Sequence, residues 1–124
     1  MIKKYFLCVD GIYIKNGKIL LLKRNVEPFK GCWHVIGGHV EENETPKQAL
    51  VREFKEETNL DVEIGEIIDA RIEKTSDRTK IIVAYGVTSA EGKIRLDSES
   101  QEYDWFTQTP NNSVYNYDKY LKKK

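Results

Sequence analysis

Three glutamates, Glu53, Glu56 and Glu57, stand at positions i, i+3 and i+4 within the segment from residue 38 to residue 60. On an α-helix with 3.6 residues per turn, this spacing confines them to an arc of about 100°. Carboxylates crowded in this way repel one another unless a cation lies among them. Magnesium prefers oxygen ligands and is held in proteins by few carboxylates together with water. The spacing therefore indicates a divalent-metal site on one face of a helix.

A solvated charged face is the common alternative for such a run, and it predicts a lysine or arginine four residues after each glutamate. The residues at those positions are Glu57, Leu60 and Asp61. Only Arg52, four residues before Glu56, is placed to offset the charge. Ala49 is expected on the same face, where its small side chain would leave room for a ligand. Helix geometry alone leaves both interpretations open.

The helix that must carry these glutamates is well marked in the sequence. Thr45 is suited to the N-cap and Pro46 to the first helical position, and Gln48, three residues after Thr45, completes a capping box. The apolar side of the helix consists of Leu50, Val51 and Phe54. Asn59 is suited to end the helix, because asparagine adopts the left-handed C-terminal conformation more readily than other non-glycine residues.

The rest of the chain is rich in predicted strands. Asn16-Gly17 separates two apolar runs and predicts a β-hairpin, because both turn residues tolerate positive φ. Other strands are expected at residues 5–9, 33–36, 62–72 (one or two strands, broken near Gly65), 80–87, 93–96 and 103–106. A loop is expected at 24–34 and a modest second helix at 114–121. Many strands with one strong and one weak helix predict a mixed β-sheet covered by helices.

The composition is that of one globular domain. The 124 residues include 20 basic and 20 acidic side chains, so no global field draws the protein to nucleic acid or to acidic lipid. No stretch has the length and apolarity of a membrane span, and the apolar start is too short for a signal peptide. Cys8 and Cys32 are expected to be free thiols in a reducing cytoplasm. The lysines at 122–124 are expected to form a solvated end.

The segment from residue 38 to residue 60 resembles the Nudix box of the Nudix (MutT-type) hydrolases. That box is a glycine, five residues, a glutamate, seven residues and then Arg-Glu-apolar-any-Glu-Glu-any-Gly-apolar. The residues that match in type and spacing are Gly38, Glu44, Arg52, Glu53, Phe54, Glu56, Glu57 and Leu60. Asn59 stands where the family has glycine, and Ile36 replaces a proline often found before the glycine pair. The similarity is strong over residues 19–60 and rests on strand order and length elsewhere.

The resemblance implies an α/β (α+β) Nudix fold, which is an α/β/α sandwich with a central mixed β-sheet. Residues 1–124 would form a single domain with the box at 38–60. The resemblance also implies magnesium, with manganese as a possible substitute. The implied metal ligands are the backbone of Gly38 and the side chains of Glu53, Glu56 and Glu57.

The resemblance further implies the catalytic residues, which would be Glu44, Arg52, Glu53 and Glu56. Glu53 is the first candidate for activating the attacking water, although the family varies in where its general base lies. Glu44 and Arg52 would hold the loop and the helix together, since an arginine–carboxylate pair can be bidentate.

Four further residues are candidate substrate contacts, namely Arg24, His39, Glu99 and Glu102. Arg24 and His39 have a plain alternative as solvated surface residues. Glu99 and Glu102 resemble a late acidic loop that adds a metal ligand or base in many family members, and the choice between them is open. The aromatic side chains that could stack on a base are Phe29, Trp33 and Tyr103, although aromatics at strand spacing are more often core. His34 is expected to pack within its strand.

The implied reaction is metal-dependent hydrolysis of the diphosphate linkage in a nucleoside diphosphate derivative. The short chain favours a nucleoside triphosphate, with a nucleoside monophosphate and pyrophosphate as products. ADP-ribose or another nucleotide sugar is the alternative, because residues 27–31 resemble those of ADP-ribose pyrophosphatases.

Two other classes of protein are kept as rivals. One is a nucleotide-binding regulator without catalysis, and the other is an interaction module whose acidic helix recruits a basic partner. For the enzyme, we expect a small nucleotide substrate, no nucleic-acid polymer and no membrane, a monomer or homodimer, and a cytoplasmic location.

Overall fold

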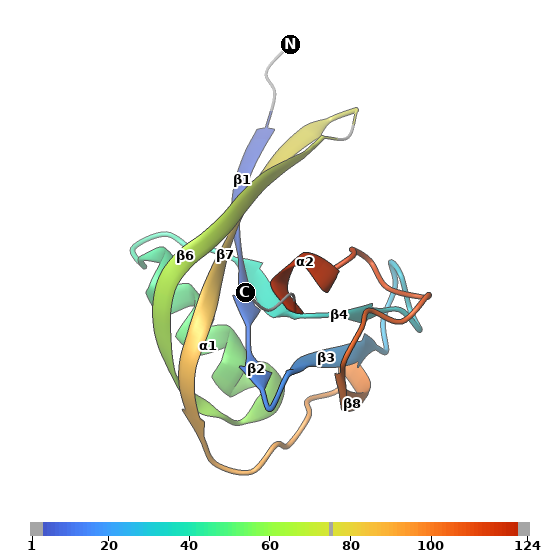
Figure 1. The fold of residues 1–124 in the computed structure, drawn as a ribbon. Coiled ribbons are helices and arrows are strands. Elements are labelled where there is room, and N and C mark those ends of the chain that lie inside the picture. The colour runs from blue at the N-terminus through green and yellow to red at the C-terminus, as the bar shows by residue number, and fades with distance from the viewer. Residues whose placement is uncertain (1–3, 75, 122–124) are drawn as a thin grey trace.

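The computed structural model describes residues 4–74 and 76–121, which form a layered α+β structure (Figure 1). The elements in chain order are β1 (Lys4–Ile12), β2 (Ile14–Lys15), β3 (Lys18–Arg24), β4 (Trp33–His34), β5 (Ile36–His39), α1 (Pro46–Thr58), β6 (Asp61–Lys74), β7 (Arg78–Glu91), β8 (Ser100–Phe106) and α2 (Asp118–Leu121).

The strands form two four-stranded sheets. The first has the order β5-β1-β7-β6. In the second, β3 pairs with each of the other three strands, which are β2, β4 and β8. Strands β1 and β7 run parallel, whereas β1–β5 and β6–β7 are antiparallel. The main sheet is therefore mixed, as the sequence predicted.

Strand β3 shows how the two apolar cores are divided. Successive side chains of a strand point to opposite faces. Accordingly, Leu20 and Leu22 belong to a cluster with Leu50 and Phe54 of α1. Ile19 and Leu21, in between, belong to a second cluster, which contains residues of the C-terminal segment. Apolar cores on both faces confirm the α/β/α arrangement.

Helix α1 begins and ends as the sequence predicts. The Thr45 hydroxyl accepts a hydrogen bond from the Gln48 backbone N–H (3.1 Å), and the Gln48 side chain accepts one from the Thr45 N–H (2.8 Å). Asn59 has φ 67°, and its backbone N–H donates to the Lys55 carbonyl oxygen. The Asn59 side chain also donates to the carbonyl oxygen of Lys93 (3.2 Å).

The hairpin prediction is also confirmed. Asn16 and Gly17 connect β2 to β3 with positive φ values of 54° and 77°. Both residues therefore adopt the conformation that a two-residue hairpin turn requires.

Two predicted elements are wrong or too long. Residues 93–96 form no strand; the Arg95 N–H instead donates to the Thr58 carbonyl oxygen at the end of α1 (2.8 Å). Within 114–121 only Asp118–Leu121 is helical. Side-chain hydrogen bonds explain the late start, because Asn116 accepts from the Asp118 N–H and Thr109 accepts from the Tyr117 N–H.

The segment predicted as one or two strands forms one strand, β6, and the break near Gly65 is a series of register shifts against β7. One further expectation needs correction. Ala49 is fully buried in the cluster beneath α1. Its small side chain therefore allows close packing of the helix on the sheet and leaves no room for a ligand.

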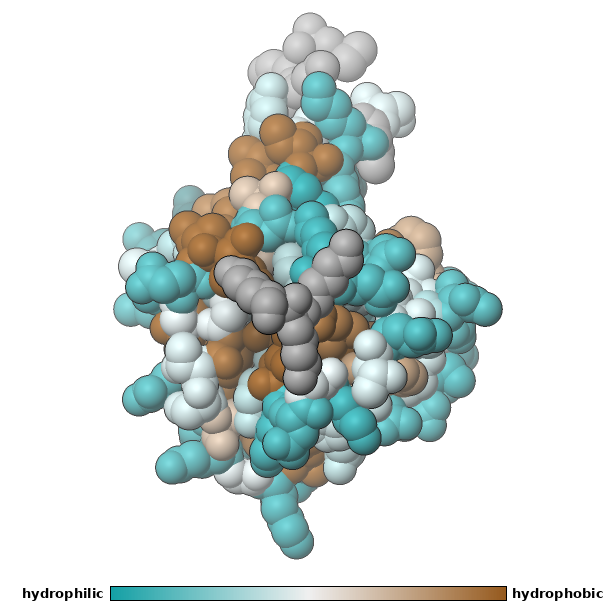
Figure 2. Space-filling model, in the orientation of Figure 1, coloured by the Kyte–Doolittle hydropathy of each residue, from teal (hydrophilic) through white to brown (hydrophobic). Residues whose placement is uncertain are grey.

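Strands β6 and β7 extend as a long ribbon, and Figure 2 shows apolar side chains gathered over its upper part. The exposed large apolar side chains on β1, β6 and β7 are Tyr5, Leu7, Ile67, Ile68, Ile72 and Ile81. Among the described residues, no helix is long and apolar enough to cross a membrane. The lysines at 122–124 lie outside the described residues.

The left-handed end of α1 gives a stability prediction. Asn59→Ala should lower the free energy of unfolding by about 1 kcal/mol, because alanine tolerates positive φ poorly. Asn59→Gly is the matched control and should change stability much less, since glycine adopts this conformation freely. Urea denaturation of both variants provides the measurement. Equal losses in the two variants would mean that the hydrogen bond to Lys93, and not the backbone conformation, dominates at this position.

Candidate active site

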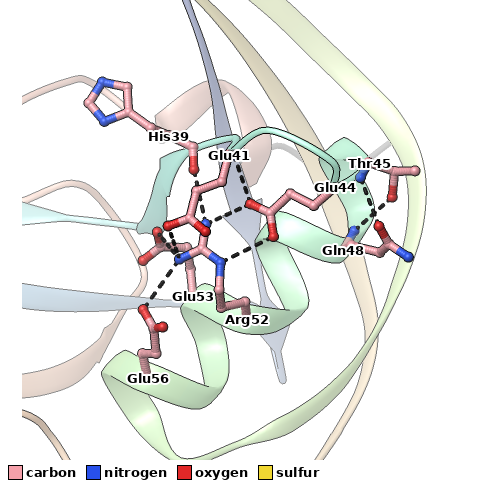
Figure 3. Close-up of polar contacts among 8 residues, drawn as sticks. All are labelled: His39, Glu41, Glu44, Thr45, Gln48, Arg52, Glu53 and Glu56. Carbon is pink, nitrogen blue, oxygen red and sulfur yellow. Dashed lines mark hydrogen bonds and ion pairs between the residues drawn. The ribbon is translucent and has the colours of Figure 1, made fainter.

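Arg52 lies at the centre of a group of carboxylates (Figure 3). Its Nη2 and Nε atoms donate to the two carboxylate oxygens of Glu44 at 2.8 and 3.2 Å. Its Nη1 atom donates to Glu53 at 3.0 Å and to Glu56 at 3.3 Å. These hydrogen bonds, chiefly the one with Glu44, raise the already high pKa of Arg52. The guanidinium is therefore a permanent cation that offsets the charge on this helix face.

The same guanidinium joins α1 to the preceding loop. Nη2 also donates to the backbone carbonyl oxygen of His39 (3.1 Å), at the end of β5. Glu44 closes the loop by accepting a hydrogen bond from the Glu41 backbone N–H (2.9 Å). The hydrogen bond from Arg52 lowers the pKa of Glu44, so that its carboxylate stays ionised. Strand, loop and helix are thus fixed relative to one another through one side chain.

Gly38 on β5 lies directly against the carboxylate of Glu53. A Cβ atom at residue 38 would overlap the oxygens of that carboxylate. Only glycine therefore allows Glu53 to approach the backbone of β5. The Glu53 carboxylate and the peptide groups of Gly38 form one continuous polar surface.

Glu57 is buried, with 8% of its surface exposed. Burial raises its pKa strongly, and a hydrogen bond with Glu53 and the charges of Asp97 and Glu99 act in the same direction. Crowded, desolvated carboxylates of this kind are stabilised in ionised form by a cation. Glu53 and Glu57, with the backbone of Gly38, supply the hard oxygen donors that a divalent ion prefers.

Glu56 takes a different position from its two neighbours. Its side chain is 56% exposed and faces Arg52. Within the described ranges 4–74 and 76–121, no group of three His, Cys, Asp or Glu side chains is arranged as a metal cluster. The structure thus brings Glu53 and Glu57 together and leaves Glu56 outside their pair.

A cavity of about 670 Å³ adjoins the Glu53–Glu57 pair. Of the residues singled out in the sequence, it is lined by Arg24, Phe29, His34, Gly38, His39, Glu53, Glu57 and Glu99. Glu102 is not in its wall and instead lies 3.7 Å from the Lys23 ammonium. The geometry therefore separates Glu99, which faces the cavity, from Glu102, which does not.

The three aromatic candidates differ in their position relative to the cavity. Trp33 is buried and packs edge-on against Phe106, with ring centroids 4.8 Å apart, which confirms the core alternative. Phe29 is exposed in the loop that borders the cavity, whereas Tyr103 is exposed outside it. Arg24 is anchored in the same loop through a hydrogen bond from Nε to the Pro28 carbonyl oxygen (2.7 Å).

The far wall of the cavity contains polar residues that the sequence analysis missed. These are Asp10, Arg71, Glu73, Lys80 and Tyr117, from β1, β6, β7 and the C-terminal segment. They lie far apart in the chain and meet only because β1 and β6 both pair with β7. The sequence contains one signal for this wall. Asp10 lies inside the otherwise apolar run 5–14, and a buried carboxylate requires a hydrogen-bonding or charged partner.

Comparison with known proteins agrees with this geometry. The family model described as NUDIX domain matches residues 4–116. An ADP-ribose pyrophosphatase of Methanocaldococcus jannaschii is 36% identical over 113 residues, which cover 85% of this chain and 67% of the relative. A CTP pyrophosphohydrolase of Escherichia coli is 34% identical over 98 residues, which cover 78% of this chain and 72% of the relative.

Solved structures give the same result. The solution structure of the Escherichia coli ORF135 protein superposes with a TM-score of 0.77 at 30% identity, covering 85% of this chain and 75% of that chain. A MutT Nudix hydrolase of Burkholderia pseudomallei has a TM-score of 0.79 at 23% identity, over 85% of this chain and 84% of that one, and supports the fold alone.

The fold and the carboxylate helix define a hydrolase of the pyrophosphohydrolase class. The chain belongs to the Nudix family. Members of this family act on small nucleotide substrates and generally need divalent metal ions.

The shared guanidinium gives a prediction for activity. Arg52→Lys should lower kcat/KM by about tenfold or more, because an ammonium cannot hold Glu44, Glu53 and the His39 carbonyl at once. The far-UV circular dichroism spectrum should be unchanged. Lys55→Ala is the control, since the one ion pair of Lys55 among the described residues is with exposed Asp61 at 3.2 Å. Wild-type kinetics in the Arg52→Lys variant would show that the geometry of the guanidinium is not required.

The buried carboxylate pair gives a prediction for metal binding. A ligand that binds only the folded state raises its stability, so magnesium should raise the melting temperature by about 3 °C or more. Glu57→Gln should keep the melting temperature measured in EDTA but lose most of this rise. Glu66→Gln, an exposed change on β6, is the control. A full magnesium response in the Glu57→Gln variant would remove Glu57 from the metal site.

Proposed function

We propose that this protein hydrolyses a nucleoside triphosphate to a nucleoside monophosphate and pyrophosphate with a divalent metal ion. The observation that carries the proposal is the pair of Glu53, which lies against Gly38, and the buried Glu57; both line a cavity of about 670 Å³. That volume lies within the usual range for small-molecule sites.

The chain's own residues have separate roles in this proposal. Glu53, Glu57 and the backbone of Gly38 would hold magnesium, for which manganese could substitute. When bound, such an ion neutralises phosphate oxygens and lowers the pKa of a coordinated water. Glu53 orients the attacking water, with its carboxylate fixed by Arg52 at 3.0 Å.

The other candidates complete the site. Arg52 and Glu44 keep α1 in register with the loop. Glu56, whose exposed carboxylate accepts a hydrogen bond from Arg52 at 3.3 Å, would serve as an additional metal ligand. Arg24 and His39, on the cavity wall, are assigned to substrate contacts. Glu99 is preferred to Glu102 as the additional acidic residue, since only Glu99 lines the cavity.

The choice of a triphosphate is supported by relatives named for such substrates. These are the Escherichia coli CTP pyrophosphohydrolase and an 8-oxo-dGTP diphosphatase of Proteus vulgaris, each 34% identical to this chain. ADP-ribose is the second candidate, because the Methanocaldococcus jannaschii relative is named for it and matches at 36%.

The two free cysteines, Cys8 and Cys32, support a cytoplasmic setting.

A substrate panel tests the proposal. The purified protein is incubated with the common ribo- and deoxyribonucleoside triphosphates and with ADP-ribose, in magnesium, in manganese and in EDTA. We expect metal-dependent release of a nucleoside monophosphate and pyrophosphate from at least one triphosphate. Exclusive cleavage of ADP-ribose would favour the second candidate, and no cleavage of any compound would refute the proposal.

The catalytic assignment of Glu53 is tested with the best substrate from that panel. Glu53→Gln should lower kcat by about a hundredfold or more, because a carboxamide is a poor base and a weaker metal ligand. The exposed Glu66→Gln variant is the matched control and should keep wild-type kinetics. If Glu53→Gln turned over at a near-normal rate, Glu53 would have no catalytic role.

A further inference from the structure

The far wall of the cavity contains a second charged pair, separate from the carboxylates of α1. Nη1 of Arg71 on β6 lies 3.3 Å from Oδ2 of Asp10 on β1. Both side chains are largely buried, with 18% and 17% of their surfaces exposed, and both line the cavity. Arg71 reaches diagonally across β7 to make this contact, because it pairs with Ile82 of β7 whereas Asp10 pairs with Ala84.

Arg71 is held firmly in this position. Its guanidinium carbon lies 3.7 Å from the centre of the Tyr115 ring, and Nε donates to Glu73 at 3.3 Å. The Tyr115 ring in turn packs edge-on against Tyr117, with ring centroids 5.4 Å apart. A planar guanidinium fixed by stacking and by two carboxylates has little freedom, and it therefore fixes the Asp10 carboxylate as well.

The other oxygen of Asp10 is available to a ligand. The hydrogen bond from Arg71 goes to Oδ2, and Oδ1 accepts none from the residues that the structure describes. It lies beside Gly37, where an added Cβ atom would be 3.0 Å away. Gly37 adjoins Gly38, so Oδ1 and the carboxylate of Glu53 lie on opposite sides of one glycine dipeptide. The cavity, which both residues line, connects them.

A purely structural ion pair does not account for this geometry well. In the same chain, Arg52 uses two donors and engages both oxygens of Glu44, at 2.8 and 3.2 Å. Arg71 engages one oxygen of Asp10, which lines the cavity, and leaves the second without a hydrogen bond from the described residues. Burial raises the pKa of Asp10 to about 6 and Arg71 opposes that rise, so at about pH 8 the carboxylate is ionised and accepts hydrogen bonds.

We propose that Asp10, positioned by Arg71, determines base specificity by accepting a hydrogen bond from the exocyclic amino group of a cytosine or adenine base. This inference rests on the proposed function, because it takes the ligand of the cavity to be a nucleotide. Cytosine and adenine carry such an amino group. Their deaminated counterparts, uracil and hypoxanthine, present a carbonyl oxygen there, which a carboxylate repels. A site built to accept a hydrogen bond discriminates strongly against an analogue that lacks the donor.

The test compares amino and oxo substrates in the full-length enzyme with magnesium at about pH 8. The pairs are CTP with UTP and ATP with ITP, and they separate base recognition from the chemistry at the phosphates. The wild type should prefer the amino member of at least one pair by about tenfold or more in kcat/KM. Asp10→Asn should reduce that preference by about tenfold, because a carboxamide can also donate to a carbonyl oxygen.

Two further variants keep the test decisive. Glu66→Gln, an exposed change on β6 outside the cavity wall, is the control and should retain the wild-type amino preference. Arg71→Lys should also weaken the amino preference, because lysine does not fix the Asp10 carboxylate. This variant provides the test if Asp10→Asn folds poorly. Thermal unfolding of each variant monitors the fold independently of the ratio.

The outcomes separate this inference from the proposed function. If Asp10→Asn lost kcat/KM equally on amino and oxo substrates, Asp10 would be a structural ion-pair partner only, and the inference would be overturned. A wild type without amino preference would also overturn it. Absence of any nucleotide hydrolysis would refute the proposed function instead. In that case, titration of the wild type and Asp10→Asn with CMP and UMP tests base recognition alone, and equal binding of both by the wild type would overturn it.

Discussion

The site depends on one guanidinium shared among carboxylates. Glu44, Glu53 and Glu56 would repel one another on the loop and on α1, and Arg52 binds all three together with the His39 carbonyl oxygen. A planar group with several fixed donors can satisfy this geometry, whereas a single ammonium cannot. Because Arg52 contacts strand, loop and helix, the orientation of α1 and the position of Glu53 are set by the same interaction.

The glycine pair on β5 imposes the complementary constraint. Any side chain at Gly37 would collide with the Val9 carbonyl oxygen, and any side chain at Gly38 would collide with Glu53. The bare backbone therefore allows one carboxylate to approach from α1 while β1 approaches from the neighbouring position. The cavity can thus have acidic groups on both sides of a single short strand.

The parts of the site that follow local rules were predictable from the sequence. The capping box at Thr45, the left-handed end at Asn59 and the Asn16-Gly17 hairpin are each determined by a few adjacent residues. The far wall was not predictable, because Asp10 and Arg71 meet only through pairing of distant strands. The expected strand at 93–96 and the early helix start at 114 failed because hydrogen bonds to other segments and to nearby side chains replaced regular structure.

The residues proposed for the chemistry and those proposed for base recognition lie in different parts of the structure. The first lie on α1 and β5 and are tied together by Arg52. The second lie on β1 and β6, and Asp69 of β6 holds the C-terminal segment through contacts with Lys119 (2.6 Å) and Tyr120 (2.7 Å). Substitutions in this second group can alter which base or sugar fits while the Glu53–Glu57 pair stays intact. That separation offers a physical reason why relatives of this chain can be named for substrates as different as ADP-ribose and CTP.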